Sequence, residues 1–260
     1  MPELPEVETI VRGLAPRLTG ARIRDAQCSC ARILRGDLSW VIGKTIARVM
    51  RHGKFIVFDL GGDARLTIHL GMTGKLLVGG ERTPYTRAAF LLDRGELLYD
   101  DIRTFGRVEV TSGLPARVEA LGPDPLAIDV EDFVALVRSH RGRIKPLLLN
   151  QRFLRGLGNI YVDESLFAAA IHPLAVAARL PRQRLQHLHE CIQQTLQSAI
   201  EHGGSSISDY VNSDGRRGGF QNLHAVYGRE DLPCLVCRTP VRRIVVAQRG
   251  THLCPKCQKR

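Results

Sequence analysis

Four cysteines near the C-terminus have the spacing of a metal site. They form two C-x2-C pairs, Cys234 with Cys237 and Cys254 with Cys257, and sixteen residues separate the pairs. Four thiolates at this spacing are typical of a structural zinc site, because they fill the coordination shell and leave no position for a reactive water. Disulfide bonds are the alternative, but such pairs in a reducing compartment usually bind metal. We therefore expect one structural Zn2+ ion.

The N-terminus is the second feature that could do chemistry, because Pro2 and Glu3 follow Met1 directly. Proline near a terminus usually marks only a helix start, and glutamate in a first turn suits the helix dipole. Removal of Met1 would leave a secondary amine at Pro2, and a reference pKa of about 7.7–8.0 makes part of it nucleophilic near pH 7. Attack on an electrophilic carbon would give a permanently cationic iminium ion, and Glu3 or Glu6 could then transfer protons.

The charge distribution favours a polyanionic partner. The net charge is +11, and the basic excess is concentrated in two stretches. Residues 133–162 carry six basic side chains and residues 233–260 carry seven, with no acidic residue in either stretch. A solvated basic surface would explain one such stretch alone, whereas the two together favour nucleic acid. Neither a secretory leader nor an apolar run long enough to span a membrane is expected.

The elements that must position these residues change in pattern along the chain. Apolar spacing of three and four predicts a helix over 6–18, and short β-rich runs then follow from 21 to about 111. After the turn-rich segment 121–125, periodicity predicts helices over 130–139, 146–150, 159–171 and 181–202. The segment 203–219 is rich in Gly and Ser and is predicted to be a mobile loop outside any core. A β-hairpin over 241–248 would present Arg249 between the cysteine pairs.

Five sequence blocks resemble those of the formamidopyrimidine-DNA glycosylase family, also called 8-oxoguanine DNA glycosylases, and they run nearly from end to end. The blocks are residues 2–9, residues 69–74, residues 156–161 continuing to His172-Pro173, residues 226–229, and the cysteine pairs that flank Gln248-Arg249. The related endonuclease VIII branch opens with Pro-Glu-Gly-Pro-Glu. Leu4 in this chain therefore favours the branch that acts on purine lesions.

The resemblance implies a bifunctional DNA glycosylase and AP lyase that excises oxidised purines, such as 8-oxoguanine and formamidopyrimidines, from duplex DNA. Pro2 would form a Schiff base at the sugar C1′, Glu3 would act as general acid-base residue, and β,δ-elimination would follow. Lys54, Asn159 and Arg249 would hold phosphates of the damaged strand, Lys54 and Arg249 as part of the catalytic set. The alternatives are an oxidised-pyrimidine glycosylase of the endonuclease VIII type and a damage-binding protein that does not cut.

The resemblance also implies that three side chains fill the gap left by an everted nucleotide, namely Met72, Arg103 and Phe105. Each of them alone would more often be a core or turn residue. The chain departs from the family pattern around Arg103, where the Pro-Arg-Arg form is missing. It departs again at Arg217 and Gly219, where a proline and a larger side chain are expected in the loop that covers the lesion.

The expected fold is α+β, with an N-terminal catalytic β-sandwich and flanking helices over 1–125. A helix-two-turn-helix domain with the lesion-capping loop would occupy 126–221, and a zinc-finger β-hairpin would occupy 222–260. The expected partner is double-stranded DNA with oxidised bases or abasic sites, bound by a monomer. The expected location is the bacterial cytoplasm, in association with the nucleoid.

Overall fold

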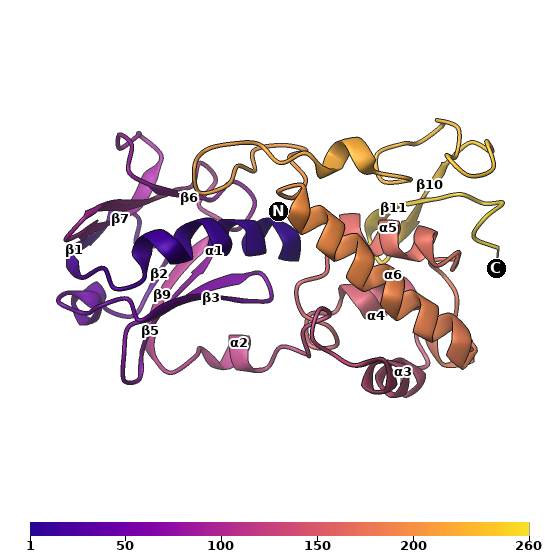
Figure 1. The fold of residues 1–260 in the computed structure, drawn as a ribbon, viewed down its shortest axis with the longest axis horizontal. Coiled ribbons are helices and arrows are strands. Elements are labelled where there is room, and N and C mark those ends of the chain that lie inside the picture. Colours follow the sequence, from indigo (N-terminus) through magenta and orange to yellow (C-terminus); the bar gives the residue numbers. More distant parts are fainter. Residues whose placement is uncertain (260) are drawn as a thin grey trace. The chain divides into compact units, whose positions relative to one another are not determined.

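The computed structural model describes residues 1–259, so Arg260, the last basic residue of the C-terminal stretch, lies outside the described residues (Figure 1). The chain forms two compact units. The first unit contains residues 1–120 together with 200–221, and the second contains residues 121–199 together with 222–259. The segment 200–221 therefore packs with the N-terminal residues although it follows the helical region in sequence.

The first unit is built around two β-sheets. The four-stranded antiparallel sheet has the order β1-β7-β8-β6, from β1 (Ile23–Cys28), β6 (Lys75–Val78), β7 (Thr86–Leu92) and β8 (Gly95–Asp100). The five-stranded sheet has the order β2-β9-β5-β4-β3, from β2 (Leu34–Arg35), β3 (Arg48–His52), β4 (Phe55–Asp59), β5 (Ala64–His69) and β9 (Arg107–Ser112). Side chains of both sheets share one buried core, which includes Phe58 and Phe90. The predicted β-sandwich is confirmed.

Helix α1 (Leu4–Leu18) covers part of this sandwich. Its apolar residues at spacings of three and four join the same core, and the helix packs against β3 and β4. It begins two residues earlier than the sequence predicts because Glu3 already serves as the N-cap and Pro5 is accommodated in the first turn. Two short helices, η1 (Leu38–Val41) and α2 (Ala116–Glu119), complete the N-terminal part.

The second unit begins with helices and ends with a hairpin. Its helices are α3 (Val130–Arg138), α4 (Ile144–Leu149), α5 (Asn159–Ala168), η2 (Ala177–Arg179), α6 (Arg182–Glu201, whose last two residues enter the first unit) and η3 (Phe220–Leu223, which joins the two units). The four predicted helices all exist; the starts of α3 and α5 agree with the prediction, and the other bounds differ by one to three residues. Helix α5 stops early because Ala170 takes a left-handed backbone conformation with φ of 54°.

The hairpin consists of β10 (Arg242–Val246) and β11 (Arg249–Leu253). Ala247 and Gln248 both have positive φ, which is the geometry of a tight two-residue hairpin turn. The predicted hairpin therefore exists, but its second strand continues to Leu253. Arg249 opens this strand instead of following the hairpin.

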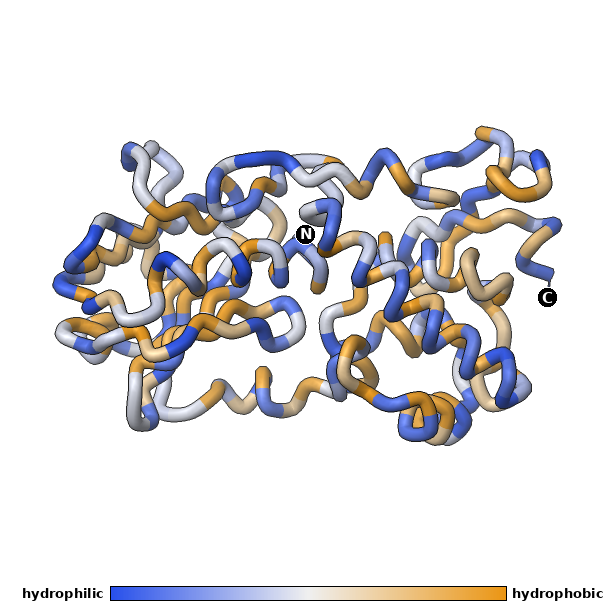
Figure 2. Tube along the Cα trace, viewed as in Figure 1, coloured by the Kyte–Doolittle hydropathy of each residue, from blue (hydrophilic) through white to orange (hydrophobic). Residues whose placement is uncertain are grey.

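The loop 203–219 has no regular secondary structure, as predicted, and Figure 2 shows it as a mostly polar segment. The prediction that it lies outside any core is wrong. Tyr210 is 7% exposed and belongs to the core of the first unit, and Ser205 and Ser206 are also buried. The Tyr210 hydroxyl donates to the carbonyl oxygens of Gly203 at 3.1 Å and Glu6 at 3.3 Å, so one aromatic residue anchors the loop to α1.

None of the helices among residues 1–259 combines the length and the apolar character that crossing a bilayer requires.

Candidate active site and zinc hairpin

The two residues that follow Met1 are buried at the start of α1. Pro2 and Glu3 are both buried, whereas Met1 is 51% exposed. The backbone N–H of Glu3 donates to Glu6 Oε2 at 2.8 Å, and the backbone N–H of Ser205 donates to Glu6 Oε1 at 2.7 Å. One buried carboxylate therefore holds both the terminus and the loop 203–219 in place.

The surroundings of the chain terminus lower the pKa of its amine, which in this structure belongs to Met1. Burial is the largest cause of this lowering, the charge of Lys54 adds to it, and Glu3 and Glu6 oppose it. Lys54 is itself only 7% exposed and follows Gly53, whose φ of 62° forms the turn between β3 and β4. An amine with a lowered pKa is neutral, and so nucleophilic, in a larger fraction of molecules at neutral pH.

His69 is influenced by the charge of Lys54, as the terminus is, and no role was predicted for it. Burial lowers its pKa to about 4, and the charges of Lys54 and Arg117 add to this effect. The ring packs against Phe55 with 4.8 Å between centroids, and Nδ1 accepts from the Gly71 backbone N–H at 3.2 Å. His69 is therefore a neutral side chain at pH 7. The sequence signals that could have pointed to it are its place directly before the Leu70-Gly71 turn and its position in the family-like block 69–74.

The three predicted gap-filling residues lie on two loops that touch. Met72 is 42% exposed and Phe105 is 49% exposed, and the guanidinium of Arg103 stacks over the Phe105 ring at 4.6 Å. The two loops meet closely, because a Cβ added to Gly71 would come within 2.6 Å of the Phe105 carbonyl carbon. The first unit therefore presents an apolar and cationic projection. We call Met72, Arg103 and Phe105 the wedge.

In the second unit, the structure brings Asn159 and Arg249 to neighbouring positions. Asn159 is the first residue of α5, and its Nδ2 donates to the backbone oxygen of Gly250 at 2.8 Å. Arg249 is exposed and makes no salt bridge with any residue between 1 and 259. The start of α5 and the hairpin thus form one place at which backbone amides and a guanidinium could meet an anion.

Lys145, which was counted among the basic residues that would attract a polyanion, is unavailable for that purpose. Its side chain is fully buried, and Nζ lies 2.5 Å from Asp163 Oδ1. The other carboxylate oxygen of Asp163 accepts from the His252 backbone N–H at 2.8 Å. This ion pair connects α4, α5 and β11, so it fixes the hairpin on the helices instead of binding DNA.

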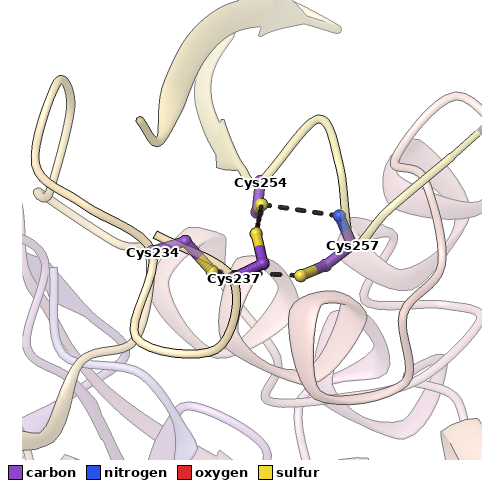
Figure 3. Close-up of side chains that lie close together, drawn as sticks. All are labelled: Cys234, Cys237, Cys254 and Cys257. Carbon is purple, nitrogen blue, oxygen red and sulfur yellow. Dashed lines mark hydrogen bonds between the residues drawn. The ribbon is translucent and has the colours of Figure 1, made fainter. Parts of the chain in front are cut away.

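The four predicted zinc ligands come together at the base of the hairpin (Figure 3). Their sulfur atoms all lie within 4.8 Å of one another, with 3.9 Å between Cys234 and Cys257 and 3.4 Å between Cys237 and Cys254. A tetrahedral site with Zn–S bonds of about 2.3 Å places its sulfurs about 3.8 Å apart. The donor set therefore fits one structural zinc ion.

Comparison with known proteins decides the family. The Formamidopyrimidine-DNA glycosylase N-terminal domain matches residues 1–108, the Formamidopyrimidine-DNA glycosylase H2TH domain matches residues 121–211, and the Zinc finger found in FPG and IleRS matches residues 231–260. A formamidopyrimidine-DNA glycosylase of Solibacter usitatus (strain Ellin6076) is 53% identical over 265 residues, covering 100% of both chains. The chain belongs to the formamidopyrimidine-DNA glycosylase family.

Solved structures of this glycosylase family share the fold. A mutant Lactococcus lactis FPG in complex with Fapy-dG containing DNA is 38% identical, with a TM-score of 0.91 and 100% of both chains covered. A complex of MutM with carbocyclic 8-oxo-G containing DNA is 37% identical, with a TM-score of 0.90 and the same coverage. The predicted α+β fold is confirmed, with its β-sandwich, H2TH domain and zinc finger. The chain is an Fpg-type DNA glycosylase with one structural zinc.

Proposed function

We propose that this glycosylase excises oxidised purines, 8-oxoguanine and formamidopyrimidines, from duplex DNA and then cleaves the strand by β,δ-elimination. The observation that carries the proposal is the start of α1, where Pro2 and Glu3 are buried, Glu6 accepts the backbone N–H of Glu3, and the charge of Lys54 lowers the pKa of the Met1 amine next to Pro2. A buried amine flanked by carboxylates and a cation is suited to covalent catalysis with proton transfer. The DNA complexes of its relatives contain the same classes of lesion.

The reaction begins when the neutral Pro2 amine, freed by removal of Met1, attacks C1′ of the damaged nucleotide. The bond between C1′ and the base breaks, and the base leaves with the electron pair of that bond and takes up the proton that the Pro2 amine loses. Glu3 supplies a proton at the sugar ring oxygen, so the ring opens to an iminium ion. The Glu3 carboxylate then accepts a proton from C2′, the electrons of that C–H bond move into the iminium to give an enamine, and the enamine expels the 3′ phosphate. A second elimination expels the 5′ phosphate.

Phosphate binding is the proposed role of Lys54, Asn159 and Arg249. Lys54 would hold a phosphate beside the terminus, since its charge already influences the terminal amine. Asn159 opens a helix of ten residues whose first amides suit an anion, and Arg249 projects from the adjacent hairpin strand. Zinc, when bound by the four cysteines, holds that hairpin in shape.

The wedge would fill the gap left when the damaged nucleotide turns out of the helix. Met72 supplies an adaptable apolar side chain, Phe105 an aromatic surface and Arg103 a donor for the base left without a partner. Their exposure is consistent with contact to DNA, because large apolar residues are seldom left in solvent together without a binding role.

We propose that three segments of the chain have different roles. Residues 1–125 carry the chemistry, residues 126–221 carry the H2TH domain and the lesion-capping loop, and residues 222–260 carry the zinc finger. The place of action would be the bacterial cytoplasm, where the enzyme meets the nucleoid.

Borohydride trapping tests the proposed chemistry. A duplex with a single 8-oxoguanine is incubated with the enzyme and borohydride, which reduces an iminium to a stable amine. We expect a covalent protein–DNA adduct that mass spectrometry of the digested protein assigns to Pro2, and no adduct with undamaged duplex. An adduct assigned to Lys54, or no adduct at all while the strand is cut, would contradict the mechanism.

A further inference from the structure

A buried carboxylate joins the two loops that carry the wedge. Met72 lies in the turn 70–74, and Arg103 and Phe105 lie in the loop 101–106. The side chain of Asp101 has no exposed surface, although the wedge residues on either side of it are exposed. A buried carboxylate needs hydrogen-bond donors from the protein in place of water. The residues that supply these donors to Asp101 show which segments it connects.

Three donors converge on this carboxylate. The Thr73 hydroxyl donates to Asp101 Oδ1 at 2.6 Å, and the Gly106 backbone N–H and the Tyr99 hydroxyl donate to Oδ2 at 2.8 Å and 3.2 Å. Burial and the neighbouring carboxylate raise the pKa of Tyr99, so its hydroxyl stays protonated and remains a donor. The Asp101 carboxylate therefore bonds to the turn 70–74, to the far end of its own loop and to strand β8.

Thr73 completes the connection from the other side. Its hydroxyl oxygen also accepts from the backbone N–H of Arg103 at 3.2 Å. One hydroxyl, placed directly after Met72, thus bonds both to the Asp101 carboxylate and to the backbone of a wedge residue. The position of Arg103 is linked to that of Met72 through a single oxygen atom.

Close packing leaves the two loops no room to slide past each other. Gly71 has φ of 60°, and a Cβ there would meet the backbone of Phe105 and Gly106 at 2.6 Å. A Cβ on Gly106 would lie 1.7 Å from the Tyr99 hydroxyl and 2.7 Å from the His69 carbonyl oxygen. The loops therefore meet through glycine backbones, which allows the hydrogen bonds around Asp101 to form.

We propose that Asp101 and Thr73 are positioning residues that make the wedge a single unit, so that the insertion of Met72 and the placement of Arg103 and Phe105 occur together. This inference rests on the proposed function, because it assumes that the wedge enters the duplex. Asp101 acts only through the residues it holds, since it has no surface with which to touch DNA. If substitution of Thr73 lowers the excision rate on duplex DNA and leaves cleavage of single-stranded DNA unchanged, Thr73 positions the wedge and does not merely stabilise the sandwich.

The test substitution is Thr73→Val, with Thr67→Val as the matched control. Thr67 is also buried in the first unit, but its hydroxyl has no hydrogen-bond partner among residues 1–259. Each variant is assayed on a duplex with 8-oxoguanine opposite cytosine and on a single-stranded oligonucleotide with a preformed abasic site, where no base stack has to be filled. Thermal unfolding is measured for both.

For Thr73→Val we expect a roughly tenfold lower excision rate on the duplex, because a hydrogen bond to a charged group is lost, with unchanged cleavage of the single strand. Thr67→Val should match the wild type on both substrates. Equal duplex excision by Thr73→Val and the wild type would overturn the inference, and so would equal losses on both substrates. If the wild type forms no borohydride adduct with the 8-oxoguanine duplex while it cuts the strand, the proposed Pro2 chemistry fails instead.

A double-mutant cycle then measures the coupling directly. In the wild-type background, Met72→Ala combined with Phe105→Ala should lose less duplex excision than the product of the two single losses, because either substitution already impairs the whole wedge. In the Thr73→Val background, or in Asp101→Asn if Thr73→Val does not fold, the two losses should multiply independently. The same coupling in both backgrounds would overturn the proposal.

Discussion

The two units differ in which charged side chains they bury and which they expose. In the first unit, Glu6 is buried and each of its carboxylate oxygens accepts a backbone N–H, so the start of α1 and the loop 203–219 are held in place. In the second unit, the buried ion pair of Lys145 and Asp163 fixes the hairpin, while Arg249 remains exposed. The difference teaches that covalent chemistry needs buried, desolvated groups, whereas binding of a polyanion needs exposed cations on a rigid support.

The largest effect is expected at the terminus. Pro2→Gly replaces the secondary amine by a primary one, whose imine can lose its proton and its charge, so the electron sink for elimination weakens. We expect strand cleavage to fall by more than roughly a hundredfold, with nearly unchanged affinity for lesion duplex. Cleavage and filter-binding assays check this. Full activity in enzyme whose intact mass shows that Met1 is retained would rule out the amine mechanism.

The next largest effect is expected for Glu3→Gln, which should affect base excision and strand cleavage to different extents. Glu3→Gln keeps the shape but cannot donate a proton, so we expect base excision from 8-oxoguanine duplex to fall by roughly a hundredfold. Cleavage of a preformed abasic site should fall much less, because the amine can attack an exposed aldehyde without activation of a glycosidic bond. The two rates are measured in single-turnover experiments. Equal losses on both substrates would contradict this division of roles.

Zinc removal should affect the second unit and spare the first. Cys237→Ser removes one of four thiolates, so we expect loss of zinc, unfolding of the hairpin and a fall in duplex affinity of roughly ten- to a hundredfold. Elemental analysis, duplex binding and hydrogen exchange over residues 1–120 measure these effects. Cys191→Ser is the matched control, since Cys191 is buried in the same unit and lies outside the zinc cluster.

Wild-type zinc content, affinity and folding are expected for Cys191→Ser. If Cys237→Ser loses its zinc and yet binds and cuts lesion DNA like the wild type, the finger has no role in binding, and the contrast between the two units disappears.

Acid should destabilise the second unit through His224. Burial lowers the pKa of this side chain to about 4, below the ordinary value near 6.5 that it regains on unfolding. The unfolded chain therefore binds the extra proton between these values, and stability falls as the pH falls through this window. Between pH 6.5 and pH 5, the free energy of unfolding measured with denaturant should fall by roughly 1.5 kcal/mol more in the wild type than in His224→Gln. An identical pH dependence for both would show that His224 is not buried in its neutral form.

The sequence predicted what local patterns determine. Apolar periodicity located α1, and the cysteine spacing predicted a cluster that the fold indeed brings together. The burial of Lys145 and Tyr210 was not predictable, because a partner far away in sequence or a distant core determines it. Asp101 was missed for a related reason. Two of its donors, Tyr99 and Gly106, are close to it in sequence, but Thr73 lies 28 residues away, and only the folded chain shows that this hydroxyl reaches the same carboxylate.

The smallest effect is expected for Arg249→Ala. This substitution tests whether DNA affinity depends on the position of Arg249 or only on the total charge of the hairpin. Arg249→Ala keeps the zinc site and deletes one charge-assisted phosphate contact. We expect roughly tenfold weaker binding of lesion duplex and a salt dependence lower by about one counterion. Arg242→Ala is the matched control, since it removes the same charge from an exposed position on the other strand of the hairpin.

Affinity is measured across a salt series for both variants. If binding used only the overall charge of the hairpin, the two substitutions would lower affinity and salt slope equally, and the assignment of Arg249 would be wrong. If Arg249 meets a phosphate directly, its loss exceeds that of Arg242. Arg249, unlike Arg242, directly precedes Gly250, whose carbonyl oxygen accepts from the side chain of Asn159 at the start of α5. A larger loss for Arg249→Ala therefore identifies the start of α5 and the opening residue of β11 as one phosphate site.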